Sequence, residues 1–303
     1  MSDVIATIWD FDKTLISTYM QEPIFKHFRV EGKNFWLDNN QEIKDYERKG
    51  FTVNHDSFYL NRFIRMSQKG QPFDGLNNEM LKGFGKELTF YNGAIDLLAG
   101  ISNLNNTERY KEFGIHFENY IISTGFKRII EGSAAAAYVK KIWGAEIIDK
   151  ECEDGKTRLF EVAYSLDNTS KTRALFEINK GVGIVEGSKI DVNTKIDKEQ
   201  RRVQFCNMVF VADGPSDVPA FSIINQNKGS TLAVYPKGDA TAFRQVDTLR
   251  RDGRVQMIAE ADYTEGSSAY LWLFERLQEQ ANVIIDRVKA RYSQNPGTPQ
   301  HLV

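Results

Sequence analysis

Two aspartates separated by one residue, Asp10 and Asp12, stand directly after a short apolar stretch, and Thr14 follows them. The stretch, residues 5–9, is typical of a buried strand, so both carboxylates should lie where that strand ends. Two like charges 4 Å apart cost roughly 4 kcal/mol near a protein surface. A bound cation or a shared chemical task would hold them together, whereas the plainest alternative is an ordinary Asx turn.

Two other predicted strands also end in polar residues. Residues 116–122 lead into Ser123-Thr124-Gly125, and residues 208–212 lead into Asp213, with Asp217 four residues later. Each ending alone fits a simple turn. Ligands of open α/β sheets bind at the carboxyl ends of the strands, so the three endings together predict one site.

A lysine stands between the second and third of these signals. Asn168-Thr169-Ser170 predicts a helix N-terminus, which places Lys171 in the first turn of that helix. A single lysine is usually a solvated surface residue. Its position between two strand endings makes Lys171 a candidate for the same site.

In order and spacing these motifs resemble the haloacid dehalogenase-like hydrolase superfamily, and in particular its phosphoserine-phosphatase-like branch with a helical cap. The matching positions span residues 5–234, and the aspartate motif is the most specific part. The resemblance implies a magnesium-dependent phosphatase with an aspartyl-phosphate intermediate.

The resemblance also implies a role for each motif residue. Asp10 would be the nucleophile and Asp12 the general acid and base. Ser123 in the first place, or its neighbour Thr124, would hold the phosphoryl oxygens, Gly125 would also bind the phosphate, and Lys171 would neutralise it. The expected metal ligands are Asp10, the backbone carbonyl of Asp12, Asp213, and Asp217 directly or through water. Asp217 would alternatively orient Lys171.

Charge supports this assignment independently. Four aspartates and one lysine make a site too negative to receive a phosphate dianion unless a cation binds there. Mg²⁺ prefers octahedral oxygen coordination and partners phosphates, and neither Cys152 nor Cys206 offers a soft-ligand alternative. A carboxylic acid at Asp12 can protonate an alkoxide leaving group, which favours a phosphatase over a dehalogenase.

The elements that must position these residues alternate between strand and helix. We expect an α/β fold with a doubly wound, mainly parallel sheet and an inserted helical cap. The expected division is 1–16 and 90–294 for the core, 17–89 for the cap and 295–303 for a flexible tail. We also predict a helix over 134–142, strands over 145–148 and 159–165, an irregular excursion over 181–202 and a long helix from 268 to about 292.

Composition narrows the class of protein. The chain has 303 residues, and its formal net charge of −2 gives no basic field for nucleic acid. We expect no membrane partner and a cytoplasmic location, because no apolar run approaches the roughly 18 residues of a membrane span and no secretory signal is evident. The sequence leaves the oligomeric state open.

The substrate is less well defined. We expect a small phosphorylated metabolite, but the position aligned with the phosphoserine-binding glutamate of the resembled branch is Tyr19, and the nearest acid is Glu22. Arg201 and Arg202 either reach an anionic substrate or are solvated. Two alternatives stay open: a phosphotransferase or phosphomutase with the same intermediate, and a non-catalytic protein that senses a phosphorylated ligand.

Overall fold

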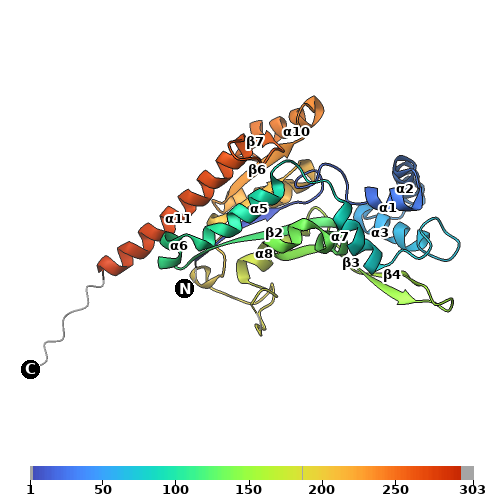
Figure 1. Cartoon of the computed structure of the whole chain (residues 1–303), viewed down its shortest axis with the longest axis horizontal. Helices are drawn as coiled ribbons and strands as arrows, with labels where there is room; N and C mark the ends of the chain where they lie inside the picture. The colour runs from blue at the N-terminus through green and yellow to red at the C-terminus, as the bar shows by residue number, and fades with distance from the viewer. Residues whose placement is uncertain (1–2, 186, 295–303) are drawn as a thin grey trace, which may run out of the picture.

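The computed structural model describes residues 3–185 and 187–294. The tail expected at 295–303 lies outside the described residues. Within them, seven strands form one sheet in the order β4-β3-β2-β1-β5-β6-β7 (Figure 1). The strands are β1 (Asp3–Trp9), β2 (Ile115–Phe126), β3 (Val139–Glu151), β4 (Thr157–Tyr164), β5 (Met208–Ala212), β6 (Ser230–Tyr235) and β7 (Met257–Glu260).

The sheet is parallel except at one edge. All neighbouring strands from β3 to β7 pair in parallel, while β4 pairs with β3 as an antiparallel hairpin. The connections from β1 lead to β2 and β3 on one side and later to β5, β6 and β7 on the other. The strand order therefore reverses around β1, and such a reversal opens a crevice at the carboxyl ends of the strands.

Helices cover both faces of the sheet, which confirms the predicted doubly wound α/β fold. The described α-helices are α1 (Glu22–Phe28), α2 (Gly32–Arg48), α3 (His55–Met66), α4 (Asn78–Phe84), α5 (Ala94–Asn103), α6 (Glu108–Glu112), α7 (Lys127–Gly132), α8 (Lys171–Lys180), α9 (Val218–Gln226), α10 (Ala240–Arg251) and α11 (Ser268–Gln294). None of those described is both long enough and apolar enough to cross a bilayer.

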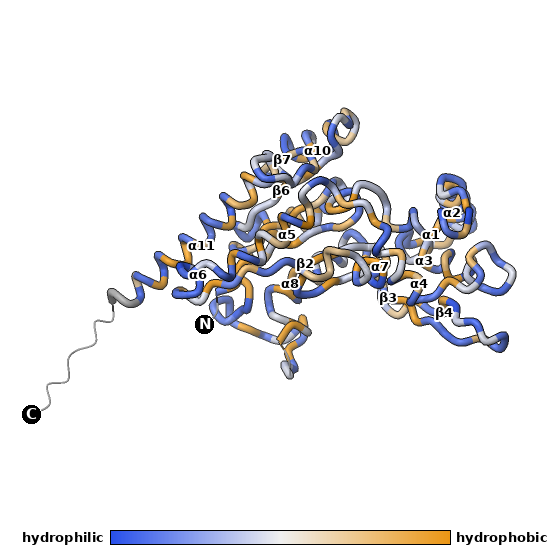
Figure 2. Tube along the Cα trace, in the orientation of Figure 1, coloured by the Kyte–Doolittle hydropathy of each residue, from blue (hydrophilic) through white to orange (hydrophobic). Residues whose placement is uncertain are grey.

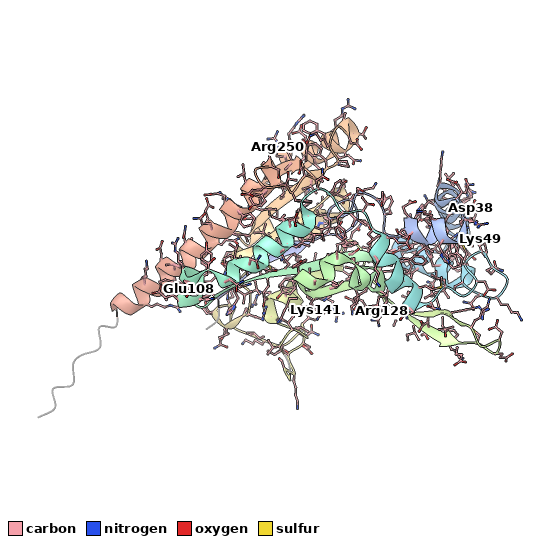
Figure 3. The ribbon with its side chains drawn as sticks, viewed as in Figure 1. Asp38, Lys49, Glu108, Arg128, Lys141 and Arg250 are labelled. Atoms are coloured by element: carbon pink, nitrogen blue, oxygen red, sulfur yellow. The ribbon has the colours of Figure 1, made fainter. Side chains whose placement is uncertain are left out.

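Successive side chains of β1 point to opposite faces of the sheet, and each face packs against its own layer of helices. Ile5 and Trp9 join one apolar cluster, which also contains residues of α5, α7 and α11. Ala6 and Ile8 join the other, with residues of α8, α9 and α10. Figure 2 shows apolar and polar residues alternating along α11, as expected for a helix with one face on the sheet. Charged side chains such as Asp38, Glu108 and Arg250 lie on the periphery (Figure 3).

The structure corrects several predicted elements. Only a 3₁₀ turn (Ala134–Tyr138) stands where a helix over 134–142 is predicted, and β3 begins at Val139, so the predicted short strand is thirteen residues long. Trp143 and Ile147 of β3 are buried against the helices, and this tertiary burial outweighs local helix propensity. Residues 181–185 and 187–202 are irregular as predicted, apart from one 3₁₀ turn (Lys198–Gln200). The sequence reasoning did not include α10 and β7.

The helical segment, residues 17–89, holds α1–α4 and gathers at one end of the molecule (Figure 1). Aromatic rings pack at its centre. The centre of the Phe25 ring lies 5.1 Å from that of Phe35 and 5.9 Å from that of Phe63. The chain enters and leaves it at adjacent points, where Ser17 N–H donates to Thr89 O at 3.0 Å and Tyr91 N–H to Leu15 O at 2.9 Å. The division of the chain into core and cap at these points stays a prediction.

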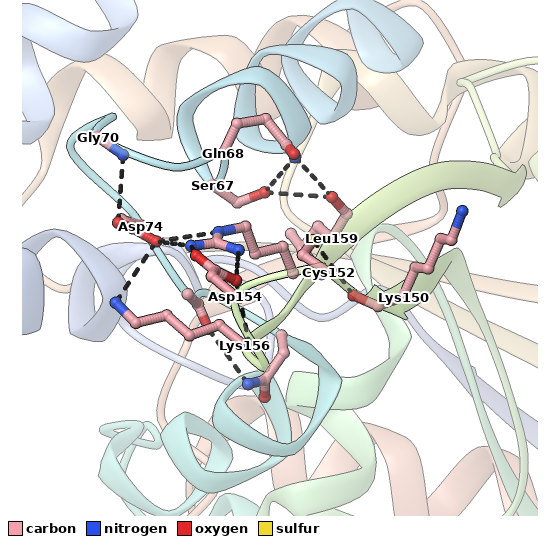
Figure 4. Close-up of polar contacts among 12 residues, drawn as sticks. Ser67, Gln68, Gly70, Asp74, Lys150, Cys152, Asp154, Lys156 and Leu159 are labelled. Atoms are coloured by element: carbon pink, nitrogen blue, oxygen red, sulfur yellow. Dashed lines mark hydrogen bonds and ion pairs between the residues drawn. The ribbon is translucent and has the colours of Figure 1, made fainter.

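A buried arginine ties the helical segment to the β3–β4 hairpin. The Arg158 side chain is 2% exposed, and its guanidinium lies 2.7 Å from Asp74 and 2.7 Å from Asp154. Figure 4 shows both carboxylates together, with the Lys156 ammonium 3.8 Å from Asp74. The Arg158 hydrogen bonds hold the pKa of Asp154 below its usual value. The Gly70 amide and then Arg158 do the same for Asp74.

We expect Arg158→Met to lower the melting temperature, because it leaves two carboxylates without their shared partner. Carboxyls with depressed pKa values stabilise the fold above their unfolded pKa of about 3.9, and this stabilisation is lost as the pH falls further. The difference in melting temperature between parent and variant should therefore be steady at neutral pH and shrink below about pH 4. Lys156→Met, at a 58% exposed side chain, is the matched control with a smaller effect. An equal loss in both variants would contradict the prediction.

Candidate active site

The end of β1 places Asp10 between two neighbouring strands. Trp9 pairs with Ile121 of β2 on one side and with Val211 of β5 on the other, and Asp10 N–H donates to Val211 O at 2.9 Å. The residues that follow on these strands therefore meet around Asp10, which is itself buried. Ser123 and Asp213 are among those residues, so the three motifs reach one edge of the sheet.

Lys171 bridges two of the aspartates. Its Nζ donates to Asp10 Oδ1 at 2.7 Å and to Asp217 Oδ1 at 2.7 Å. The lysine side chain is 3% exposed and that of Asp217 is fully buried. Burial alone would lower the pKa of Lys171, but the two carboxylates outweigh it and raise the pKa above its usual value. Lys171 is therefore a fixed positive charge beside Asp10.

One structural detail before this lysine differs from the prediction. Ser170 precedes α8 but makes no side-chain cap. Instead the Asp167 carboxylate accepts from the amides of Thr169 at 3.0 Å and Ser170 at 2.7 Å. Lys171 still occupies the first helical position, as predicted.

Three carboxylates converge at the same edge. Asp10, Asp213 and Asp217 each offer an oxygen, and these oxygens lie within 4.8 Å of one another. Burial raises the pKa of Asp10 to about 6, where Asp217 adds to the effect and Lys171 opposes it. Burial, then Asp10 and Asp217, raises the pKa of Asp213 to about 7. Hard oxygen donors this close suit Mg²⁺, whose charge would offset their repulsion.

Asp12 is held apart from that cluster. Its Oδ1 accepts from Met20 N–H at 2.9 Å, and the left-handed backbone at Lys13 (φ 56°) turns the chain directly after it. Burial, then the neighbouring Asp10, raises the pKa of Asp12 well above its usual value. A carboxyl in this environment holds a proton more readily than a solvated one and suits acid–base chemistry.

The polar signature of β2 divides into two parts. The strand continues through it to Phe126 rather than ending there. Ser123 is buried, and its Oγ accepts from Gly125 N–H at 3.1 Å. Thr124 instead faces the helical segment: its carbonyl accepts from Tyr59 Oη at 2.8 Å. A Cβ at Gly125 would lie 2.4 Å from the end of the Met20 side chain, so this glycine lets Met20 pack closely against β2.

Tyr263, which the sequence reasoning missed, helps to hold the aspartate motif in place. Tyr263, in the loop between β7 and α11, donates its Oη to Thr14 O at 2.6 Å, and its ring packs edge-on against Trp9. Thr14 Oγ1 lies 3.3 Å from Asp10 Oδ2. Nothing in the local sequence around Tyr263 signals this contact, since it joins residues 249 positions apart.

Comparison with known proteins gives relatives in sequence and in structure. No protein-family model matches the chain. It is 35% identical over 289 residues to an uncharacterized protein of Borreliella burgdorferi, which covers 91% of this chain and 97% of that protein. The chain belongs to the same family as this protein.

The structural relatives are more distant in sequence. A HAD family hydrolase from Salmonella enterica serovar Typhi superposes with a TM-score of 0.51 at 13% identity, over 84% of this chain and 66% of that one. The chain has the fold of the haloacid dehalogenase-like (HAD) superfamily. A phosphoserine phosphatase in apo form also aligns, with a TM-score of 0.49 at 15% identity over 84% of this chain and 93% of that one. This chain spans about two thirds of the length of the Salmonella HAD hydrolase.

Beside the cluster of Asp10, Asp213, Asp217 and Lys171 lies a cavity of about 480 Å³, which we call the segment pocket, between the helical segment and β2. Asp12 and Thr124 line it from the core, and α2 and α3 line it from the helical segment. Tyr19 also faces it, whereas Glu22 is not among its lining residues.

The arginines considered for substrate contact lie elsewhere. Arg201 and Arg202 border a second cavity with Asp3 and Val4, at the amino end of β1 and so at the opposite end of that strand from Asp10. Arg202 is paired with Glu118 at 2.6 Å. Of the two alternatives left open for Arg201 and Arg202, this position at the amino end of β1 does not favour substrate contact, because Asp10 follows the carboxyl end of that strand.

Proposed function

We propose that the protein is a magnesium-dependent phosphatase that hydrolyses a small phosphorylated metabolite through a phosphoryl group on Asp10. The observation that carries this proposal is the Lys171 ammonium held 2.7 Å from both Asp10 and Asp217, with Asp213 in the same cluster. The site thus combines a nucleophile, a fixed cation and oxygen ligands for a second cation. Phosphoryl transfer needs chiefly such positioning and positive charge.

In the first step an Asp10 carboxylate oxygen attacks phosphorus, and the bond from phosphorus to the ester oxygen breaks. Asp12, whose environment favours its protonated form, gives its proton to the departing alkoxide. Lys171 offsets the negative charge on the transferring group, and Ser123, two residues after the β2 partner of Trp9, would donate a hydrogen bond to that group.

In the second step Asp12, now a carboxylate, takes a proton from water as the water oxygen attacks phosphorus. The bond between Asp10 and phosphorus breaks, inorganic phosphate leaves and Asp10 is regenerated. Asp10, Asp213, Asp217 and the carbonyl of Asp12 are the groups that would hold Mg²⁺. When bound, Mg²⁺ supplies positive charge that offsets the phosphoryl oxygens and the clustered carboxylates.

The metal dependence is tested by assaying an aryl phosphate with and without Mg²⁺. We expect hydrolysis to stop on chelation and to return with added Mg²⁺. Asp213→Asn should raise the Mg²⁺ concentration needed for half-maximal activity by at least about tenfold, because it removes one charged ligand. Asp252→Asn, at an exposed carboxylate after α10, is the matched control and should leave this concentration unchanged. Activity that survives exhaustive chelation would refute the metal requirement.

A further inference from the structure

The segment pocket contains buried polar atoms that no protein group satisfies. Gln21 is 3% exposed and Asn39 is 2% exposed, yet Gln21 Oε1 and Asn39 Oδ1 have no hydrogen-bond partner among the described residues. The indole Nε1 of Trp36, which also lines the pocket, has none either. Buried polar groups in folded proteins are nearly always paired, so these three atoms indicate where a bound molecule completes the set.

One group in the pocket wall distinguishes between classes of ligand. Gln21 and Asn39 each carry an amide with an acceptor oxygen and N–H donors, whereas the Asp56 carboxylate in the first turn of α3 only accepts. The Trp36 N–H is an unpaired donor among the described residues. An ammonium group offers three donors and no acceptor, whereas a carboxylate or phosphate offers only acceptors.

The charges around the pocket point the same way. Asp12 and Asp56 line it, and no lysine or arginine does so within the described part of the chain. The nearby cations are engaged: Lys171 with Asp10 and Asp217, and Lys13 with the Tyr19 ring, whose centre lies 4.3 Å from its Nζ. His55 stands at the rim, 3.8 Å from Glu47. A second anionic group on the ligand would meet two carboxyls, and neither a lysine nor an arginine among the described lining residues.

Aromatic rings provide the remaining wall. Trp36 and Tyr59 both line the pocket, with ring centres 5.5 Å apart. Tyr59 donates its Oη to Thr124 O, so its ring is held against β2 in the wall that Asp12 also lines. Aromatic faces attract a desolvated cation, which adds to the acceptors already described.

We propose that the segment pocket binds the leaving group of the substrate and that this group is an amino alcohol. The substrate is then a phosphate monoester whose alcohol carries an ammonium and no second negative charge. Gln21, Asn39 and Asp56 accept from the ammonium while the phosphoryl group lies at Asp10. This inference rests on the proposed phosphatase function.

The test compares four esters with the whole protein and Mg²⁺. Phosphoethanolamine carries an ammonium on its alcohol part, and n-propyl phosphate matches it in size without a charge there. The third ester, 2-phosphoglycolate, carries a carboxylate instead. The fourth, p-nitrophenyl phosphate, reports whether the protein hydrolyses phosphate esters at all. We expect kcat/KM for phosphoethanolamine to exceed that for n-propyl phosphate roughly 10- to 100-fold, as charge-assisted hydrogen bonds provide. The value for 2-phosphoglycolate should be lower still.

Two variants tie that preference to the pocket. Asp56→Asn should reduce the ratio of kcat/KM between phosphoethanolamine and n-propyl phosphate by about tenfold or more, since it removes the acceptor charge. Gln21→Leu keeps the volume and removes an acceptor that is unpaired in the free protein, so it should fold and also lower the ratio. Asp45→Asn makes the same acid-to-amide change at a 48% exposed carboxylate on α2 and should leave the ratio unchanged.

The outcomes separate this inference from the function on which it rests. Hydrolysis of p-nitrophenyl phosphate without a preference for phosphoethanolamine overturns the amino alcohol and leaves the phosphatase standing. A preference that persists in both pocket variants overturns the assignment to this pocket. Failure to hydrolyse any of the four esters overturns the proposed function and this inference together.

Discussion

Asp10→Asn is expected to reduce turnover by on the order of 10⁵-fold or more, because an amide nitrogen or oxygen cannot replace the attacking carboxylate. The change is nearly isosteric, and Lys171 keeps its second partner, Asp217, at 2.7 Å. Removing one of three clustered carboxyls also lowers their mutual repulsion. The variant should therefore fold, with a melting temperature in metal-free buffer at least equal to that of the parent.

The measurement is steady-state hydrolysis of p-nitrophenyl phosphate, with folding checked by circular dichroism. A rapid-mixing experiment on the parent protein should also detect phosphate bound covalently to Asp10, and the variant should show none. A folded Asp10→Asn protein that retains more than about a hundredth of the parental turnover would exclude Asp10 as the nucleophile.

Lys171→Met has the second largest expected effect, and it acts on both stability and turnover. The lysine is the shared partner of two buried carboxylates, and breaking a buried ion pair from one side costs about 3–5 kcal/mol. We expect a loss of this size in the free energy of unfolding at neutral pH in metal-free buffer. Turnover should fall by about 10²- to 10³-fold, because a fixed positive charge on the transferring group is lost.

Lys180→Met, at the other end of α8, is the matched control. Within the described part of the chain the Lys180 ammonium donates to neutral backbone carbonyls, those of Val192 and Thr194, so its removal leaves no carboxylate without a hydrogen-bond donor there. Urea unfolding of the parent and both variants measures the difference. Equal losses of stability in the two variants would show that Lys171 is no more than an ordinary packing residue.

Sequence alone predicted the central sheet because the determining signals are local. Continuous apolar runs such as β5 mark strands buried on both faces, and helices between them require parallel pairing. The direction of parallel strands then brings their polar endings to one edge, which is why Asp10, Ser123 and Asp213 were predicted to meet. The catalytic roles of these residues stay predictions until the variants are assayed.

The rest depends on contacts between distant parts of the chain. The segment pocket draws Gln21, Asn39 and Asp56 from different parts of the helical segment, and no spacing rule relates them. The antiparallel turn from β3 to β4 is stabilised by Arg158 reaching Asp74, 84 residues earlier. In both cases the contacts of these side chains depend on tertiary packing, which patterns in a single sequence do not encode.

The helical segment leaves the sheet and returns to it at adjacent points of the structure. Leu15 and Ser17 lie hydrogen-bonded beside Tyr91 and Thr89, so the more than seventy residues between them form a loop whose ends already touch. An inserted segment whose two ends lie together can be exchanged for another one, because the sheet keeps its strand order. If the proposed function holds, exchanging this segment between residues 16 and 90 should change selectivity for the alcohol, while Asp10, Asp213, Asp217 and Lys171 lie outside the exchanged residues.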